Sequence, residues 1–75
     1  MTLSQLKDGQ SAVVDSLSVC GSMRRRLQDI GFTSGASVTR LRTSPLGDPA
    51  AFEICGAVIA LRRKDASFVD CSAPE

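Results

Sequence analysis

The side chains that could carry chemistry in this chain are few, and its three cysteines come first. Cys20, Cys55 and Cys71 stand 35 and 16 residues apart with no short repeated spacing, and the chain has no histidine. Nothing supplies imidazole for proton transfer, and no nucleophile has an evident base partner. We therefore predict no enzyme activity, no catalytic residue, no cofactor and no metal ligand. The cysteines are predicted to be free thiols buried as small hydrophobic residues, with Cys20 more reactive because it lies near a helix N-terminus.

A run of three arginines, Arg24, Arg25 and Arg26, is the second group. The planar guanidinium of arginine binds carboxylates through two hydrogen bonds and is enriched at protein interfaces. The same run is typical of a solvated helix face, and the stem of Arg26 could instead lie along the core. Two interpretations stay open here: an ordinary exposed helix face, or a contact with a partner protein.

A stiff turn over residues 44–49, SPLGDP, is the third. Its two prolines fix φ, Gly47 can take positive φ, and Asp48 can close the turn with its own side chain. The turn would hold Arg42 in a defined position and present Leu46 at its tip. Turn chemistry alone explains the prolines and the glycine. Leu46 therefore either folds back on the protein or contacts a partner, with Arg42 and Asp48 beside it.

Length and composition allow one small domain over residues 1–75. The chain is 43% hydrophobic and 23% charged, which is ordinary for a folded soluble protein. Nine basic and eight acidic residues leave a net charge of +1, which argues against nucleic-acid binding. The first residues lack the apolar region of a signal peptide, and the longest apolar run, residues 57–61, is too short to cross a membrane. We therefore expect neither export by a signal peptide nor membrane insertion.

One helix must position the arginines, and its apolar spacing places it over residues 23–30. Ser22 is predicted to be its N-cap. Gly31 is predicted to end the helix in a left-handed conformation, with Phe32 folded back against the helix. The apolar face consists of Met23, Leu27 and Ile30.

Five strands are predicted, over residues 10–17, 37–43, 51–55, 57–62 and 67–71. Val38 and Leu41 break the alternation of the second strand, which requires a bulge or burial on both faces. The fourth strand is apolar on both faces, as a central strand would be. A short helical turn with Leu3 and Leu6 would cover the core, and residues 72–75 would form a flexible tail. Together these elements predict a small, mainly β barrel that is closed or nearly closed.

Four pieces of the sequence, in this order, resemble the FeoA family. They are RRRLQDIGF at residues 24–32, SGASV at 34–38, SPLGDP at 44–49 and ALRRKDA at 60–66. Each piece alone is common, and their order along one short chain makes the match specific. The resemblance covers residues 3–71. It implies an SH3-like barrel of about five strands, with one short helix inserted after the first strand.

FeoA proteins are small cytoplasmic companions of the bacterial ferrous-iron transporter FeoB. The resemblance therefore implies a non-enzymatic accessory role in ferrous iron uptake, through binding of the cytoplasmic, GTPase-containing region of FeoB. The protein would be cytoplasmic, recruited to the inner face of the membrane by this partner, and a monomer or a weak homo-oligomer. The candidate partner contacts are Arg24, Arg25, Arg26, Arg42, Leu46 and Asp48.

Two other binding functions are weighed against this one. An iron-binding carrier or metal-sensing module is the alternative, although it would have to bind ferrous iron without imidazole. Recognition of proline-rich peptides is disfavoured, because that groove needs aromatic walls and the chain has three Phe and no Tyr or Trp.

Overall fold

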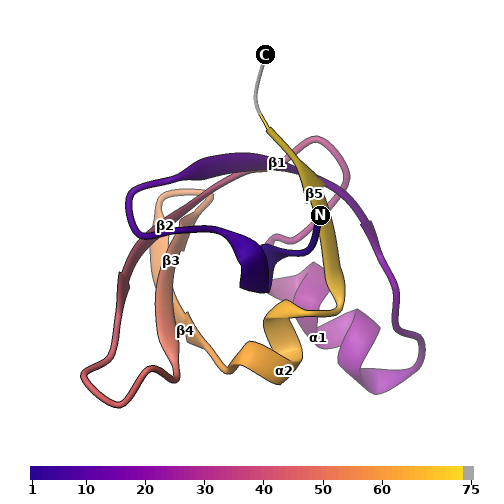
Figure 1. The fold of residues 1–75 in the computed structure, drawn as a ribbon. Coiled ribbons are helices and arrows are strands. Elements are labelled where there is room, and N and C mark those ends of the chain that lie inside the picture. Colours follow the sequence, from indigo (N-terminus) through magenta and orange to yellow (C-terminus); the bar gives the residue numbers. More distant parts are fainter. Residues whose placement is uncertain (74–75) are drawn as a thin grey trace.

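A computed structural model describes residues 1–73, which form one antiparallel sheet curled around a core (Figure 1). The five strands lie in the order β4-β3-β2-β1-β5. The elements are η1 (Leu3–Gln5), β1 (Ser11–Leu17), α1 (Ser22–Ile30), β2 (Ser37–Thr43), β3 (Ala50–Ile54), β4 (Ala57–Leu61), α2 (Arg63–Ala66) and β5 (Val69–Ser72). The register shifts once between β1 and β5 and once between β2 and β3. Bulges of this kind bend strands, which allows the sheet to curl into a partly open barrel.

The two edges of the sheet differ. Beside β5, the amide of Cys71 donates a hydrogen bond to the carbonyl oxygen of Met1 at 2.8 Å, and Thr2 forms a β-bridge with Asp70. Within residues 1–73, β4 pairs with β3 on one side and with no strand on the other. The predicted central position of this strand is therefore wrong. Its apolar run reflects an exposed edge with small alanines, not burial on both faces.

The core lies inside the curl of the sheet. The largest fully buried side chains are Phe32, Phe52, Leu3, Leu27, Ile54, Val14, Val38, Val69 and Cys71. The predicted N-terminal helical turn is the 3-10 helix η1; its Leu3 is buried, and so is Leu6, which directly follows it. The segment therefore fills the interior of the barrel as well as covering it.

The C-terminus of α1 is formed as predicted. Gly31 has φ 127°, and its amide donates to the carbonyl oxygen of Gln28 at 3.0 Å. The amide of Phe32 donates to the carbonyl oxygen of Leu27 at 3.0 Å, and the ring is fully buried. This pattern satisfies carbonyl groups that a helix end leaves without partners. Phe32 thereby fixes the end of α1 to the core.

The N-terminus of α1 differs from the prediction. Gly21 occupies the N-cap position with φ 75°, and Ser22 is the first helical residue. The predicted N-cap at Ser22 is wrong because the chain enters the helix through a positive φ, which glycine adopts without steric cost.

All five predicted strands are present, and their ends lie within one or two residues of the predicted bounds. β2 has the predicted bounds, and of the two alternatives for its broken alternation the structure has the bulge, between Arg40 and Arg42. Cys55 is not in a strand: with φ 52° it begins a two-residue turn between β3 and β4, which needs positive φ at both positions. Residues 67–68 follow the unpredicted short helix α2, so β5 begins later than predicted. Ser72 lies in β5 and not in the predicted tail, the end of which, residues 74–75, lies outside the described residues.

Candidate protein-interaction surface

The three consecutive arginines lie on the exposed side of α1. All three are exposed, whereas Leu27 on the opposite side of the helix is buried. Arg24 donates a hydrogen bond from Nη1 to the carbonyl oxygen of Leu17 at 3.2 Å, which ties α1 to the end of β1. Within residues 1–73, Arg25 and Arg26 have neither a side-chain hydrogen bond nor an ion pair. Two guanidinium groups are therefore free to bind a carboxylate on another molecule.

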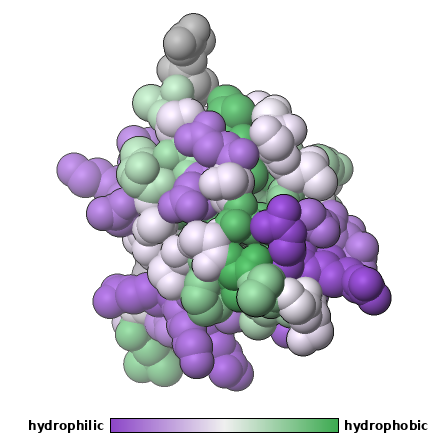
Figure 2. All heavy atoms as spheres, turned by 90° about the vertical axis from the view of Figure 1, so that its right-hand side faces the viewer, coloured by the Kyte–Doolittle hydropathy of each residue, from purple (hydrophilic) through white to green (hydrophobic). Residues whose placement is uncertain are grey.

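The surface around these arginines is open and mixed in polarity. The hollow that runs along α1 is lined only by residues of the segment 21–30, so it is the outer side of one helix and not a cleft between elements. Figure 2, which views the right-hand side of Figure 1, shows a broken band of hydrophobic atoms with hydrophilic side chains on both sides. A contact at this helix would therefore depend mainly on charged side chains.

The turn over residues 44–49 holds Leu46 in solvent. The amide of Ser44 donates a hydrogen bond to the carbonyl oxygen of Pro49 at 3.1 Å. The amide of Gly47 donates one to the carbonyl oxygen of Ser44 at 2.8 Å. Leu46 is 94% exposed. The interpretation in which Leu46 folds back on the barrel is therefore wrong, and a rigid turn presents an apolar side chain.

Asp48 has a structural contact that the sequence did not predict. Its Oδ1 accepts a hydrogen bond from the backbone amide of Arg63 at 2.8 Å. This bond connects the turn to the first residue of α2, where helix amides lack partners. The Asx turn predicted within residues 44–49 is replaced by this longer-range bond. Asp48 therefore helps to hold the turn that carries Leu46.

The six candidate residues form two separate groups. Figure 1 shows α1 and the turn between β2 and β3 on opposite sides of the barrel. Arg42 is exposed at the bulge of β2, on the side of the turn. The fold therefore brings Arg42, Leu46 and Asp48 to one region and the three arginines of α1 to another.

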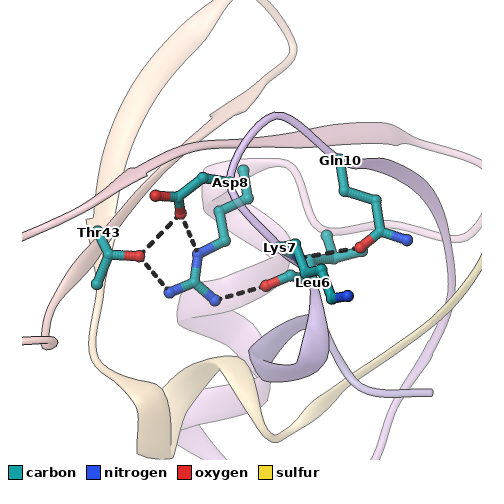
Figure 3. Close-up of polar contacts among 6 residues, drawn as sticks. Leu6, Lys7, Asp8, Gln10 and Thr43 are labelled. Atoms are coloured by element: carbon teal, nitrogen blue, oxygen red, sulfur yellow. Dashed lines mark hydrogen bonds and ion pairs between the residues drawn. The ribbon is translucent and has the colours of Figure 1, made fainter.

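Arg40 is a residue whose role the sequence did not reveal. In Figure 3 dashed lines join an unlabelled guanidinium group to the labelled residues Leu6, Asp8 and Thr43, and these contacts identify the group as that of Arg40. Its side chain is 14% exposed, and its Nε forms an ion pair with Oδ1 of Asp8 at 3.1 Å but no hydrogen bond. Nη1 donates to the carbonyl oxygen of Leu6 at 2.7 Å, and Nη2 donates to Oγ1 of Thr43 at 2.6 Å. The guanidinium also lies 5.9 Å from the ring centre of Phe52. Arg40 thus holds the N-terminal segment on the barrel.

The three cysteines lie apart and differ in exposure. Cys71 is buried as predicted, but Cys20 and Cys55 are exposed, so their predicted burial is wrong. Cys55 is exposed because it forms a turn and not a strand. Across the described residues 1–73, no three cysteine or carboxylate side chains lie close enough to hold a metal ion.

The thiol of Cys71 gives a testable prediction. Burial raises the pKa of Cys71 above its ordinary value of 9.0; the N-terminal ammonium opposes this rise, and the carboxylates of Asp15 and Asp70 add to it. The unfolded thiol therefore ionises at a lower pH than the folded one. We expect the free energy of unfolding to fall as pH rises above about 9, because the unfolded state releases its proton first. Urea titrations at pH 7.5 and pH 10 measure this decrease.

Two variants separate this effect from other titrations. Cys71→Ala should lose part of the decrease, whereas Cys55→Ala, at an exposed position, should retain it in full. An equal decrease in all three proteins would show that Cys71 does not cause it. At pH 7.5 a thiol reagent should modify Cys20 and Cys55 in the folded protein, and Cys71 only after unfolding.

No helix of residues 1–73 has the length and apolar character to cross a membrane.

An antiparallel five-stranded barrel with a helix inserted between β1 and β2 is the architecture of a small SH3-like domain. The family model of the FeoA domain matches residues 1–72. The chain belongs to the FeoA family.

Similarity to individual proteins of solved structure supports this assignment. The NMR structure of the FeoA protein from Chlorobium tepidum has a TM-score of 0.89 and 38% identity, covering 97% of this chain and 70% of that one. The crystal structure of Stenotrophomonas maltophilia FeoA complexed with zinc, described as a prokaryotic SH3 domain protein, has a TM-score of 0.86 and 33% identity, covering 96% of this chain and 89% of that one. The predicted SH3-like barrel is confirmed.

A longer relative comes from Porphyromonas gingivalis. It is described as an Fe(2+) transport protein A/Fe(2+) transporter FeoB fusion protein, and it is 34% identical over 70 residues. The match covers 93% of this chain and 8% of that protein.

Proposed function

We propose that this chain is a non-enzymatic accessory protein of ferrous iron uptake that binds the cytoplasmic, GTPase-containing region of a FeoB-type transporter. The observation that carries the proposal is the Porphyromonas gingivalis relative, in which a region like this chain shares one polypeptide with FeoB. Joining two modules raises their effective concentration for each other, which favours a direct contact between them. On this proposal the protein works in the cytoplasm, at the inner face of the membrane, and GTP belongs to the partner.

The two groups of exposed residues suggest how such a contact forms. Leu46 is an apolar tip on a turn fixed by hydrogen bonds, so it loses little conformational entropy when it enters a pocket. Arg25 and Arg26 supply guanidinium groups that suit carboxylates of the partner. Because the groups lie on opposite sides of the barrel, we propose that they contact two different parts of the transporter. Arg42 and Asp48 belong to the contact around Leu46.

A titration of isotope-labelled protein with the soluble GTPase-containing domain of the transporter tests the proposal. We expect backbone amide signals to shift in residues 24–26, in residues 46–48, or in both. Absence of shifts in both segments with the partner in excess would contradict the proposal.

Variants then measure each contact separately. Leu46→Ser should weaken binding by about tenfold, the loss expected when an apolar anchor worth roughly 1.4 kcal/mol is removed. Leu41→Ser, at another exposed leucine, is its matched control and should leave binding unchanged. Arg25→Glu should weaken binding by a smaller factor that decreases as salt is added, because the attraction between exposed charges is screened.

Lys7→Glu is the control for Arg25→Glu, since it makes the same change in charge at an exposed site away from α1. If Lys7→Glu weakens binding as much as Arg25→Glu, net charge and not a specific contact is responsible. If Leu46→Ser and Leu41→Ser behave alike, the turn is not part of the interface.

A further inference from the structure

The free edge of β4 lacks the features that normally protect an edge strand. Its five residues, AVIAL, include no charge and no proline, and its pairing with β3 has no bulge. Val58 is 61% exposed, and both alanines of the strand are exposed. An uncharged, regular and apolar edge of this kind is a template for pairing with another strand.

The turn before β4 determines which backbone groups of the strand are free. A two-residue turn makes Ile54 and Ala57 a hydrogen-bonded pair, and such pairs alternate along an antiparallel ladder. The N–H and C=O groups of Val58 and Ala60 therefore point away from β3. No backbone hydrogen bond from a loop or another element of residues 1–73 reaches them.

The same edge carries an apolar projection and, beside it, a hollow lined in part by small side chains. Val58 projects from the outer face of the sheet. Two positions along the strand, on the same face, Ala60 and its cross-strand neighbour Ala51 line a hollow that also borders Pro45 and Pro49. Small side chains at Ala51 and Ala60 leave room there for one branched side chain.

We propose that two copies of this chain pair antiparallel through β4, about a two-fold axis at Ile59. In this register Val58 lies opposite Ala60 of the second copy, and Ala60 lies opposite Val58 of the second copy. Each of these pairs exchanges two backbone hydrogen bonds, because all four residues have outward-pointing N–H and C=O groups. Each Val58 side chain lies beside Ala60 of the second copy, where the hollow of that copy receives it.

Self-complementarity favours a second copy over an unrelated strand. A two-fold axis requires that a surface fit itself, and here the projection and the hollow lie on one strand at a spacing of two residues. The five paired residues include no charged side chain, so no like charges meet across the axis. An interface built on one short strand buries less than the roughly 1,000 Å² of a stable complex, so the dimer should be weak and depend on concentration.

Sedimentation and NMR measurements on the protein alone test this proposal. The protein concentration should run from about ten micromolar to about one millimolar, a range that brackets weak association. We expect the sedimentation coefficient to rise with concentration. The amide signals of Val58 and Ala60 should shift in parallel, and that of Ile59 should shift less because its amide already bonds to β3. No transporter domain is present, so the result does not depend on the proposed function.

Val58→Lys should raise the dissociation constant of the dimer at least about tenfold, because a two-fold symmetric interface contains the substituted residue of both copies. Val58 is exposed and its neighbour on β3 is Glu53, so the lysine should not disturb the fold, which circular dichroism checks. Leu41→Lys makes the same kind of change at an exposed aliphatic residue two strands away and should dimerise like the original protein.

Three outcomes would overturn the proposal. The protein could remain monomeric with unchanged Val58 and Ala60 signals at the highest concentration. It could dimerise equally well with Val58→Lys, which would place the interface elsewhere. The two amides could instead shift only when the transporter domain is added, which would assign the β4 edge to that partner.

Discussion

Replacing Phe32 by alanine is expected to remove a large part of the protein's free energy of unfolding. The ring is fully buried, and its backbone amide fixes the end of α1. Removing a buried phenylalanine costs about 3–5 kcal/mol, since transfer energy is lost and a cavity remains. A domain of this length is stable by only about 4–11 kcal/mol in total, so the loss takes up much or all of it. Circular dichroism and urea titration measure the change.

Phe68 and a conservative substitution provide the controls. Phe68 is only partly buried, so Phe68→Ala should destabilise the protein much less than Phe32→Ala. Phe32→Leu keeps most of the apolar volume and should recover most of the lost stability. If Phe32→Ala and Phe68→Ala cost the same, burial of Phe32 does not anchor α1 as the structure indicates.

Replacing Arg40 by alanine is expected to lower the free energy of unfolding by about 2–3 kcal/mol, the range for losing several hydrogen bonds of a mostly buried charged group. The variant loses the bonds to Leu6 and Thr43, the ion pair with Asp8, and the packing of the stem and guanidinium near Phe52. It also releases the N-terminal segment, so amides near Leu6 should exchange faster with solvent. Urea titration and hydrogen exchange measure the two effects.

Two further variants show which part of the Arg40 contact matters. Asp8 is 56% exposed, so Asp8→Asn should cost under about 1 kcal/mol, because water screens the ion pair. Arg40→Lys keeps the charge but not the planar group that reaches Leu6 and Thr43 together, and it should recover little stability. If Arg40→Lys is as stable as the original protein, charge alone explains the role of Arg40.

The predictions from sequence succeeded where a short segment determines its own conformation. The bounds of β2, its bulge and the end of α1 at Gly31 depend on residues within a few positions of one another. Burial of Phe32 also follows locally, because a hydrophobic residue after such a helix end packs back on the helix.

Several errors concern contacts between distant segments, whereas those at Ser22 and Cys55 concern local backbone conformation. The apolar run of β4 is compatible with a central or an edge strand, and only the strand order decides between them. Asp48 and Arg63 are 15 residues apart, and Arg40 and Leu6 are 34 apart, so no periodicity predicts either bond. The turn position of Cys55 could have been predicted locally, because the Cys-Gly pair before β4 fits the rule for two-residue turns.

The sequence by itself determined the family, the barrel class, the helix with its arginines and the stiff turn, because each depends on local spacing and motif order. Only the tertiary structure decided that Leu46 stands free in solvent, that the arginines and the turn lie on opposite sides, and that β4 has an open edge. The physical reason is that exposure and strand order depend on which distant segments exclude water from each side chain and occupy each backbone hydrogen bond.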